Sequence, residues 1–358
     1  MVAPLESLED QARGVLPRAV YDYLAGGAGD ERTLDDNVAA WARVRLRPRI
    51  LCDVTEVSVA TTVLGTSVRS PVLVAPVAFH RVAHPEGEVA TARGAADGGS
   101  IMVVSTRAST TLEDIAEAAP GAALWFQVYV LRDREWTADL VARAAAAGYR
   151  ALVLTGDTPF VGRRRRDAEN GFVLPPGVGM ANLPVGADLP VADPDDFPGA
   201  QQSPAVTFDD IGWLASISRM PVVVKGVLRG DDALRCIDSG ASALVVSNHG
   251  GRQLDGAVAA ADALPEVVGA VGDRVELYVD GGIRRGTDVL KALALGARAV
   301  LVGRPILWGL ATAGAAGAQG VLELLSSELG QAMALAGARG VDELTPDLVV
   351  PSPTAPHR

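Results

Sequence analysis

Two titratable side chains stand directly after short apolar segments of this chain. His249 follows the segment Ala243–Ser247, and Asp157 follows the segment Ala151–Thr155. A neutral imidazole titrates near pH 7 and can act as a base, and a carboxylate beside it orients the ring and stabilises its protonated form. The pattern therefore predicts proton transfer at His249, with a hydrogen-bonded structural histidine as the alternative.

A lysine ends another apolar segment. The chain has only two lysines, Lys225 and Lys291, and Lys225 closes the segment Val222–Lys225. A lysine at a buried position must be paired or functional. Two hypotheses stay open for Lys225: a Schiff base with a carbonyl substrate, or a fixed positive charge beside a cofactor.

Glycines and arginines follow the last two apolar segments. Gly281, Gly282 and Arg284 come after the seventh, and Gly303 and Arg304 come after the eighth. Glycines let backbone N–H groups approach an anion, and arginines add positive charge. Both loops therefore predict a phosphate-binding site; tight turns with solvated arginines are the alternative.

Further arginines and tyrosines suit a carboxylate ligand. The planar guanidinium groups of Arg164 and Arg252 can each bind a carboxylate with two hydrogen bonds. Tyr23 and Tyr129 can add hydroxyl donors, with core packing as their alternative role. At least two arginines of the run 163–166 are expected to be solvated.

Strands alternating with helices must position these groups. The apolar segments are short and rich in β-branched residues, as in strands that are buried on both faces. The eight predicted strands are Val72–Ala75, Ile101–Ser105, Ala123–Val128, Ala151–Thr155, Val222–Lys225, Ala243–Ser247, Glu276–Asp280 and Ala299–Gly303. Helix-like segments lie between them, which predicts an α/β fold, a (β/α)8 TIM barrel with its chemistry at the C-terminal strand ends. A doubly wound open sheet is the competing fold, but the Gly-x-Gly-x-x-Gly dinucleotide fingerprint is missing after the first predicted strand.

The whole chain, residues 1–358, is predicted to be one barrel domain with three additions. Residues 1–70 are predicted to form an N-terminal helical segment. Residues 171–204 are rich in Pro, Gly and Asp and are predicted to form an active-site loop after the fourth strand. Residues 346–358 contain four prolines and are predicted to be a flexible tail.

Composition excludes several classes of protein. Apolar residues make up 49% and charged residues 21%, so the chain can bury a core and is not disordered by composition, and its net charge is −11. An acidic chain argues against nucleic acid and against an anionic membrane surface as partners. Two cysteines suit a reducing cytoplasm, and the acidic start of the chain argues against a signal peptide. No metal site is predicted.

These motifs together resemble the FMN-dependent 2-hydroxy acid oxidase/dehydrogenase family, which includes glycolate oxidase, lactate oxidase and mandelate dehydrogenase. The resemblance covers roughly residues 15–310. It rests on Tyr21-Asp22-Tyr23, Arg47-Pro48-Arg49, His84–Glu88, Asp157-Thr158-Pro159, Ser247–Asp255, Asp280–Asp288 and Gly303-Arg304-Pro305. The pair SNHGGRQLD and DGGIRRGTD is the most specific part.

The resemblance implies a role for each matching residue. His249 would be the catalytic base and Asp157 its partner, with Tyr129 also at the catalytic centre. The substrate would contact Tyr23, Tyr129, Arg164, Arg252 and Arg107. FMN would contact Pro76, Val77, Ala78, Ser105, Gln127, Thr155, Lys225, Ser247, Asp280, Gly281, Gly282, Arg284, Gly303 and Arg304.

The implied reaction is oxidation of an (S)-2-hydroxy acid to the 2-oxo acid, with O2 as acceptor and H2O2 as product. Similarity of Pro76-Val77-Ala78 and two other stretches to the hydroxymandelate oxidases favours an aromatic, mandelate-like substrate. Arg107 stands where glycolate oxidases have Trp, and it could instead favour a substrate with a second polar group. Alternatives are a dehydrogenase acting on lactate or glycolate with another acceptor, an FMN barrel of a different reaction class, a flavin-free Schiff-base aldolase and a non-catalytic relative. The family precedent implies a homotetramer, sometimes an octamer.

Overall fold

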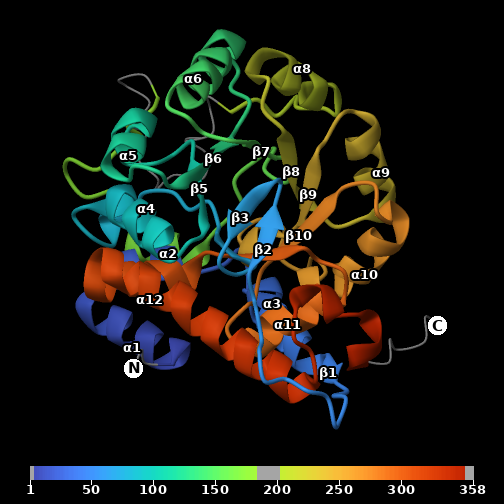
Figure 1. Cartoon of the computed structure of the whole chain (residues 1–358). Helices are drawn as coiled ribbons and strands as arrows, with labels where there is room; N and C mark the ends of the chain where they lie inside the picture. Colours follow the sequence, from blue (N-terminus) through green and yellow to red (C-terminus); the bar gives the residue numbers. More distant parts are fainter. Residues whose placement is uncertain (1–3, 184–201, 351–358) are drawn as a thin grey trace.

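The computed structural model describes residues 4–183 and 202–350 of the chain. Eight parallel strands form a closed barrel that helices surround (Figure 1). The strands are β4 (Val72–Val74), β5 (Ile101–Ser105), β6 (Ala123–Val128), β7 (Leu152–Thr155), β8 (Val222–Val227), β9 (Ala243–Val246), β10 (Glu276–Asp280) and β11 (Ala299–Val302). Each strand pairs with the next along the chain, and β11 pairs with β4 to close the barrel. The predicted (β/α)8 barrel is confirmed, and every strand end lies within two residues of its predicted position.

A helix follows each strand on the outside of the barrel. These helices are α4 (Gly87–Asp97), α5 (Leu112–Ala118), α6 (Arg134–Ala146), α8 (Asp209–Ser218), α9 (Gly230–Asp238), α10 (Ala260–Val271), α11 (Gly286–Ala294) and α12 (Arg304–Ala336). Pro305 occupies the first turn of α12, where its missing N–H costs nothing, and Gly337 ends the helix in a left-handed conformation. Within the described ranges, no helix is long and apolar enough to cross a membrane.

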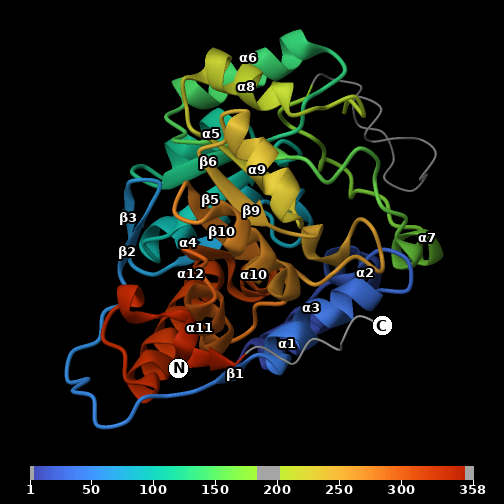
Figure 2. The same cartoon turned by 90° about the vertical axis from the view of Figure 1, so that its right-hand side faces the viewer.

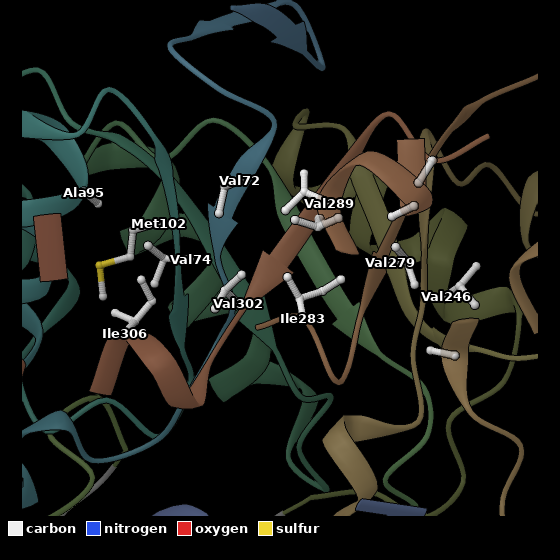
Figure 3. Packing of buried hydrophobic residues seen from close by; sticks show 14 of the residues in the cluster. Val72, Val74, Ala95, Met102, Val246, Val279, Ile283, Val289, Val302 and Ile306 are labelled. Carbon is white, nitrogen blue, oxygen red and sulfur yellow. The ribbon is translucent and has the colours of Figure 1, made fainter. Parts of the chain in front are cut away.

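Side chains of the strands alternate between two apolar layers. Leu73 belongs to the cluster inside the barrel, whereas its neighbours Val72 and Val74 pack outward against the helices. Figure 3 shows this outer layer, in which strand residues lie beside Ile306 of α12 and Val289 of α11. The continuous apolar strand sequences follow from this burial on both faces.

Helices occupy the N-terminal segment only as far as Arg43. They are α1 (Leu5–Val15), α2 (Arg18–Ala25) and α3 (Arg32–Arg43), and beyond them lie β1 (Arg45–Leu46) and a hairpin of β2 (Thr61–Val63) and β3 (Thr66–Val68). The prediction of a helical segment over 1–70 was therefore wrong for residues 44–70. Proline and β-branched residues disfavour a helix there, and Gly65 makes the hairpin turn at φ +72°. Val63 and Val68 join the cluster inside the barrel, so the hairpin closes its N-terminal end.

The C-terminal segment is ordered further than expected. Pro346–Leu348 form a 3-10 turn, and β12 (Val349–Val350) pairs antiparallel with β1. Leu348 and Val349 are buried, so the predicted flexible tail began too early, since apolar side chains at its start have a place in the core. Residues 351–358 lie outside the described residues, as do residues 184–201 of the predicted active-site loop. A short helix that was not predicted, α7 (Arg165–Asn170), precedes that loop.

Candidate active site

The C-terminal ends of the barrel strands surround a cavity. Figure 2 shows α2 and α7 near this end, away from the β2–β3 hairpin. Almost all the predicted site residues line the cavity, namely Tyr23, Pro76, Val77, Ala78, Ser105, Arg107, Gln127, Tyr129, Thr155, Arg164, Lys225, His249, Arg252, Asp280, Gly281, Gly282, Arg284, Gly303 and Arg304. The remaining two, Asp157 and Ser247, contact His249 and Lys225 directly.

The backbone around His249 aims its ring at Asp157. His249 has φ +59°, and Gly250 and Gly251 follow with φ +62° and +76°, a conformation that glycine adopts without strain. The Ser247 hydroxyl accepts a hydrogen bond from the His249 backbone N–H at 3.0 Å. His249 Nδ1 lies 3.0 Å from Asp157 Oδ1. This pairing leaves Nε2 of the ring for a ligand in the cavity.

A bulge in β8 makes room for Asp157. Gly226 has φ +107°, and a Cβ at this position would lie 2.6 Å from the Cβ of Asp157. The Thr158 hydroxyl donates to Asp157 Oδ1 at 3.1 Å. Asp157 Oδ2 is buried without a hydrogen-bond partner among the described residues. A glycine at the bulge is therefore a requirement of the His249–Asp157 contact.

The charges of this pair follow from its surroundings. Burial lowers the pKa of His249 below its ordinary value, and the Lys225 ammonium adds to this effect, while Asp157 opposes it. Burial alone would raise the pKa of Asp157, but His249 and then Lys225 outweigh it and bring the pKa to about 2. At neutral pH the imidazole is therefore neutral and the carboxylate ionised, which is the state that a general base needs.

Lys225 is a buried and paired cation. Its Nζ lies 3.2 Å from Asp280 Oδ2 and donates a hydrogen bond of 2.8 Å to Ser247 Oγ. Burial lowers its pKa, yet Asp280 and Asp157 more than compensate, so that its net pKa is raised. A Schiff-base lysine needs a depressed pKa. The pairing therefore decides between the two hypotheses in favour of a fixed positive charge.

Two arginines flank Tyr23. The Cζ atoms of Arg164 and Arg252 lie 5.5 and 5.2 Å from the centre of its ring. Arg252 donates to the backbone carbonyls of Tyr23 and Gly26, both at 2.8 Å. Burial and the charge of Arg164 lower the pKa of Arg252 to about 10. Two guanidinium groups that repel each other across one cavity favour an anionic ligand between them.

Helices α2 and α7 hold this part of the site together. Tyr23, on α2, stacks on Phe172 just after α7, with ring centres 4.3 Å apart. Arg166 of α7 pairs with Glu31 and Asp22, and Asp167 Oδ2 lies 3.2 Å from Arg164 Nη1. These contacts fix Arg164 beside Tyr23.

The loops after β10 and β11 form a positively charged cradle. Gly281 and Gly282 have φ +90° and +79°. Arg304 donates only to backbone carbonyls, and the described residues place no carboxylate within 4.0 Å of Arg304 or Arg284. Burial, then the charges of Arg252 and Arg284, lower the pKa of Arg304 to about 9. Buried cations without a carboxylate partner fit a phosphate group.

Polar atoms left without partners fit the rest of a flavin mononucleotide. The amide oxygen of Gln127 accepts from the Ser105 hydroxyl and the Thr106 backbone N–H, both at 3.2 Å, which fixes the amide. Its Nε2, like Asp280 Oδ1, is buried with no hydrogen-bond partner in the described part of the chain. Such atoms are rare unless a ligand satisfies them. Together with the cradle, these unpartnered atoms fit the predicted FMN.

Arg107 also reaches the cavity. Its Cζ lies 5.1 Å from the centre of the Tyr129 ring, and its Nη2 donates to Gln202 Oε1 at 3.3 Å. The structure therefore brings together all the residues that the sequence placed at the site.

Sequence reasoning missed two kinds of residue. One kind is apolar and lines the cavity, as Leu24, Ile283 and Leu307 do, and nothing in an apolar residue type marks such a position. The other kind supports the site from behind: Asn37 exchanges two hydrogen bonds with Asn248, of 2.9 and 2.8 Å. Asn248 stands inside the SNHGGRQLD motif, which was the available signal.

Comparisons with known proteins agree with this geometry. The family described as FMN-dependent dehydrogenase matches residues 12–351. L-lactate oxidase from Nostoc sp. is 51% identical over 345 residues, which cover 94% of each chain. 2-Hydroxyacid oxidase 1 from Homo sapiens is 45% identical, with 98% of this chain and 97% of the relative covered. A solved structure of mandelate oxidase has a TM-score of 0.90 and 47% identity, and covers 96% of this chain and 97% of that one.

The match spans nearly the whole chain, and the cavity offers what an FMN needs: a phosphate cradle, unpartnered polar atoms and a fixed lysine charge. This excludes the flavin-free aldolase. The chain belongs to the FMN-dependent dehydrogenase family and is an FMN-dependent oxidoreductase.

Proposed function

We propose that the protein oxidises an (S)-2-hydroxy acid to the corresponding 2-oxo acid. One observation carries the proposal: a neutral histidine held by a buried carboxylate shares one cavity with a pair of guanidinium groups. The arginines suit the carboxylate of such a substrate, and the histidine suits the proton that must leave it. The relatives named lactate oxidase and 2-hydroxyacid oxidase support the same reaction class.

Arg164, Arg252 and the Tyr23 hydroxyl bind and orient the substrate carboxylate. Bound FMN supplies a two-electron acceptor for the α-carbon. His249 Nε2 takes up the proton that the substrate loses, and the ionised Asp157 stabilises the imidazolium through Nδ1. Tyr129 also lines the cavity and supplies a hydroxyl donor to the reacting group.

Lys225 supplies a permanent positive charge at the cofactor. Its ammonium is protonated at neutral pH and is held by Asp280 and Ser247, so it needs no reorganisation during the reaction. A preorganised charge of this kind favours electron transfer to a group that becomes anionic.

An aromatic, mandelate-like substrate is the preferred choice for the side chain. Aromatic and apolar residues of the cavity, Tyr23, Tyr129, Leu24 and Leu307, suit a ring. A solved mandelate oxidase that contains (S)-4-hydroxymandelic acid is 45% identical, with a TM-score of 0.91. The second candidate is an aliphatic acid such as lactate, because the relative named L-lactate oxidase is 51% identical.

The proposal extends to the acceptor, the assembly and the compartment. Relatives named as oxidases support O2 as the acceptor and H2O2 as the second product, with a dehydrogenase using another acceptor as the alternative. The family precedent supports a homotetramer. Two unpaired cysteines, Cys52 and Cys236, agree with a reducing compartment such as the cytoplasm.

Steady-state oxidation by the purified protein tests this proposal. We expect (S)-mandelate to consume O2 and to yield equal amounts of benzoylformate and H2O2, whereas (R)-mandelate gives no turnover. Faster turnover of (S)-lactate or glycolate would favour the aliphatic alternative. Flavin reduction without O2 uptake would identify a dehydrogenase.

A further inference from the structure

Arg107 lines the active-site cavity beside Tyr129, and among the described residues it is the one cavity arginine whose guanidinium donates to neither a carboxylate nor a backbone carbonyl. We propose that Arg107 binds a carboxylate at the far end of the substrate side chain, so that the preferred substrates are 2-hydroxy acids with a second, distal carboxylate. This inference rests on the proposed oxidation of 2-hydroxy acids and specifies the substrate class.

The other cations around the cavity are already committed. Lys225 lies 3.2 Å from Asp280, and Arg164 lies 3.2 Å from Asp167. Arg252 and Arg304 each donate to two or more backbone carbonyls, and Arg284 donates to the carbonyl of Ile283 at 3.0 Å. These cations therefore already have partners that hold them in place.

Arg107 has fewer partners than these cations. Among the described residues its guanidinium has no carboxylate within 4.0 Å, and it donates one hydrogen bond, to the neutral amide of Gln202 at 3.3 Å. A guanidinium has five N–H donors. A partly buried charge that keeps most of its donors free costs stability unless a ligand supplies the missing partner. An anionic group on a bound molecule would supply it.

The guanidinium of Arg107 is held in place from two sides. The Tyr129 ring lies under it, with its centre 5.1 Å from Cζ. Gln202 is buried, donates through Nε2 to the carbonyl of Thr158 and forms a β-bridge with Leu131. A planar fork that is fixed before binding suits a carboxylate, which it can meet with two parallel hydrogen bonds at little cost in entropy.

Tyr129 connects Arg107 with the other groups that bind substrate. It stands at the end of β6, next to β5, from which Arg107 follows. Tyr129 also lies near enough to Arg252 and Lys225 to raise the pKa of each cation, although burial, which lowers both pKa values, has the larger effect. A substrate whose first carboxylate is bound by Arg164 and Arg252 would therefore extend along Tyr129 toward Arg107.

The decisive experiment compares substrates that differ only in the charge of the distal group. The aromatic pair is 4-carboxymandelate and its amide, 4-carbamoylmandelate; the aliphatic pair is (S)-2-hydroxyglutarate and its γ-amide. The measured quantity is the anaerobic rate constant of flavin reduction at low substrate concentration. For the wild type we expect the acid to reduce the flavin with a rate constant about tenfold or more above that of its amide, in at least one of the two pairs.

Two variants locate the effect. Arg107→Met keeps a long side chain without charge, and we expect it to bring the ratio of acid to amide to about one. Arg150→Met is the matched control, because Arg150 is exposed and directly precedes β7 at the opposite end of the barrel, and it should keep the wild-type ratio. The visible spectrum of each variant confirms that FMN is bound.

Equal rates for acid and amide in the wild type would overturn the inference, and so would an Arg107→Met variant that slows both equally. Calorimetric titration with the products, 4-carboxybenzoylformate and its amide, separates this failure from failure of the proposed function. If no hydroxy acid reduces the flavin, the reaction is wrong. Arg107-dependent preference for the charged product would then still support the anion site, and its absence would overturn it.

Discussion

The protonation state of His249 depends on its position between Lys225 and Asp157. Burial and the lysine charge favour the neutral ring, whereas the carboxylate favours the imidazolium. The net pKa lies below the ordinary histidine value of 6.5, so most molecules carry a base that is ready to accept a proton at neutral pH. The same carboxylate then stabilises the charge that forms when the proton arrives.

A pH profile follows from this state. The rate constant for flavin reduction at low substrate concentration should rise with pH and reach a plateau, with its midpoint below 6.5, because His249 must lose its proton before it can act. Stopped-flow reduction across the acidic range measures the midpoint, and the FMN content at each pH is the control. A midpoint clearly above 6.5 would contradict the assignment of His249 or its environment.

Substitution of either partner should slow the chemistry without emptying the site. His249→Ala and Asp157→Asn should each lower the rate of flavin reduction by about 10²- to 10⁴-fold, the usual contribution of a positioned base. Both proteins should keep bound FMN, since the phosphate cradle lies on other loops. A rate near that of the wild type in either variant would show that the base is elsewhere.

At the scale of elements, helix α3 supports the phosphate cradle from outside the barrel. Trp41 Nε1 donates to the carbonyl of Gly281 at 2.8 Å. A Cβ on Gly282 would lie 1.9 Å from the backbone carbonyl oxygen of Asn37. The two glycines therefore allow α3 and the loop after β10 to meet, in addition to exposing backbone N–H groups to a phosphate.

Gly282→Ala should separate these two elements. The substitution should lower the free energy of unfolding through two effects: backbone strain at φ +79°, which costs about 1–3 kcal/mol, and overpacking against Asn37, which costs about 1–3 kcal/mol. The variant should also bind less FMN than the wild type. Gly148→Ala is the matched control, because Gly148 has φ +84° but open space around its Cβ position. Urea unfolding and the ratio of flavin to protein measure the difference. Equal effects of the two substitutions would contradict the close packing at Gly282.

Arg164, for which we propose a role in substrate binding, directly precedes helix α7, and Arg166 of that helix pairs with Asp22 of α2 and with Glu31. Arg166→Gln removes the pairs with Glu31 and Asp22, which should loosen Arg164 and raise KM for the 2-hydroxy acid about fivefold with little change in kcat. Arg165→Gln is the control on the same helix, because it removes only the pair with Asp30, which lies between α2 and α3. Steady-state kinetics of both variants test the contact. An Arg165→Gln variant with the larger increase in KM would refute it.

At the scale of the whole molecule, the barrel was predictable because parallel strands buried on both faces have a distinct sequence. Short apolar segments separated by helices identified all eight strands, and the position of polar residues at their ends placed them around one cavity. The contact between His249 and Asp157 was only a hypothesis, because 92 residues separate them and the bulge at Gly226 that admits Asp157 has no clear signal.

Predictions failed where tertiary contacts decide the conformation. The hairpin of β2 and β3 is stabilised by packing into the barrel end, and β12 by pairing with β1, a partner about 300 residues earlier in the chain. Neither contact produces a local sequence pattern strong enough to change the prediction of helix over 1–70, or the prediction of a flexible tail from the prolines of 346–358. The lining residues Leu24 and Leu307 were missed for a similar reason, since apolar residues mark a core as readily as a cavity.

The visible absorption spectrum of the purified protein, recorded without oxygen before and after addition of (S)-mandelate, tests the central claim most directly. We expect an oxidised flavin spectrum that bleaches on addition of the substrate and returns when air is admitted. A flavin spectrum that persists with (S)-mandelate, (S)-lactate, glycolate and (S)-2-hydroxyglutarate alike would contradict the claim that this enzyme oxidises 2-hydroxy acids.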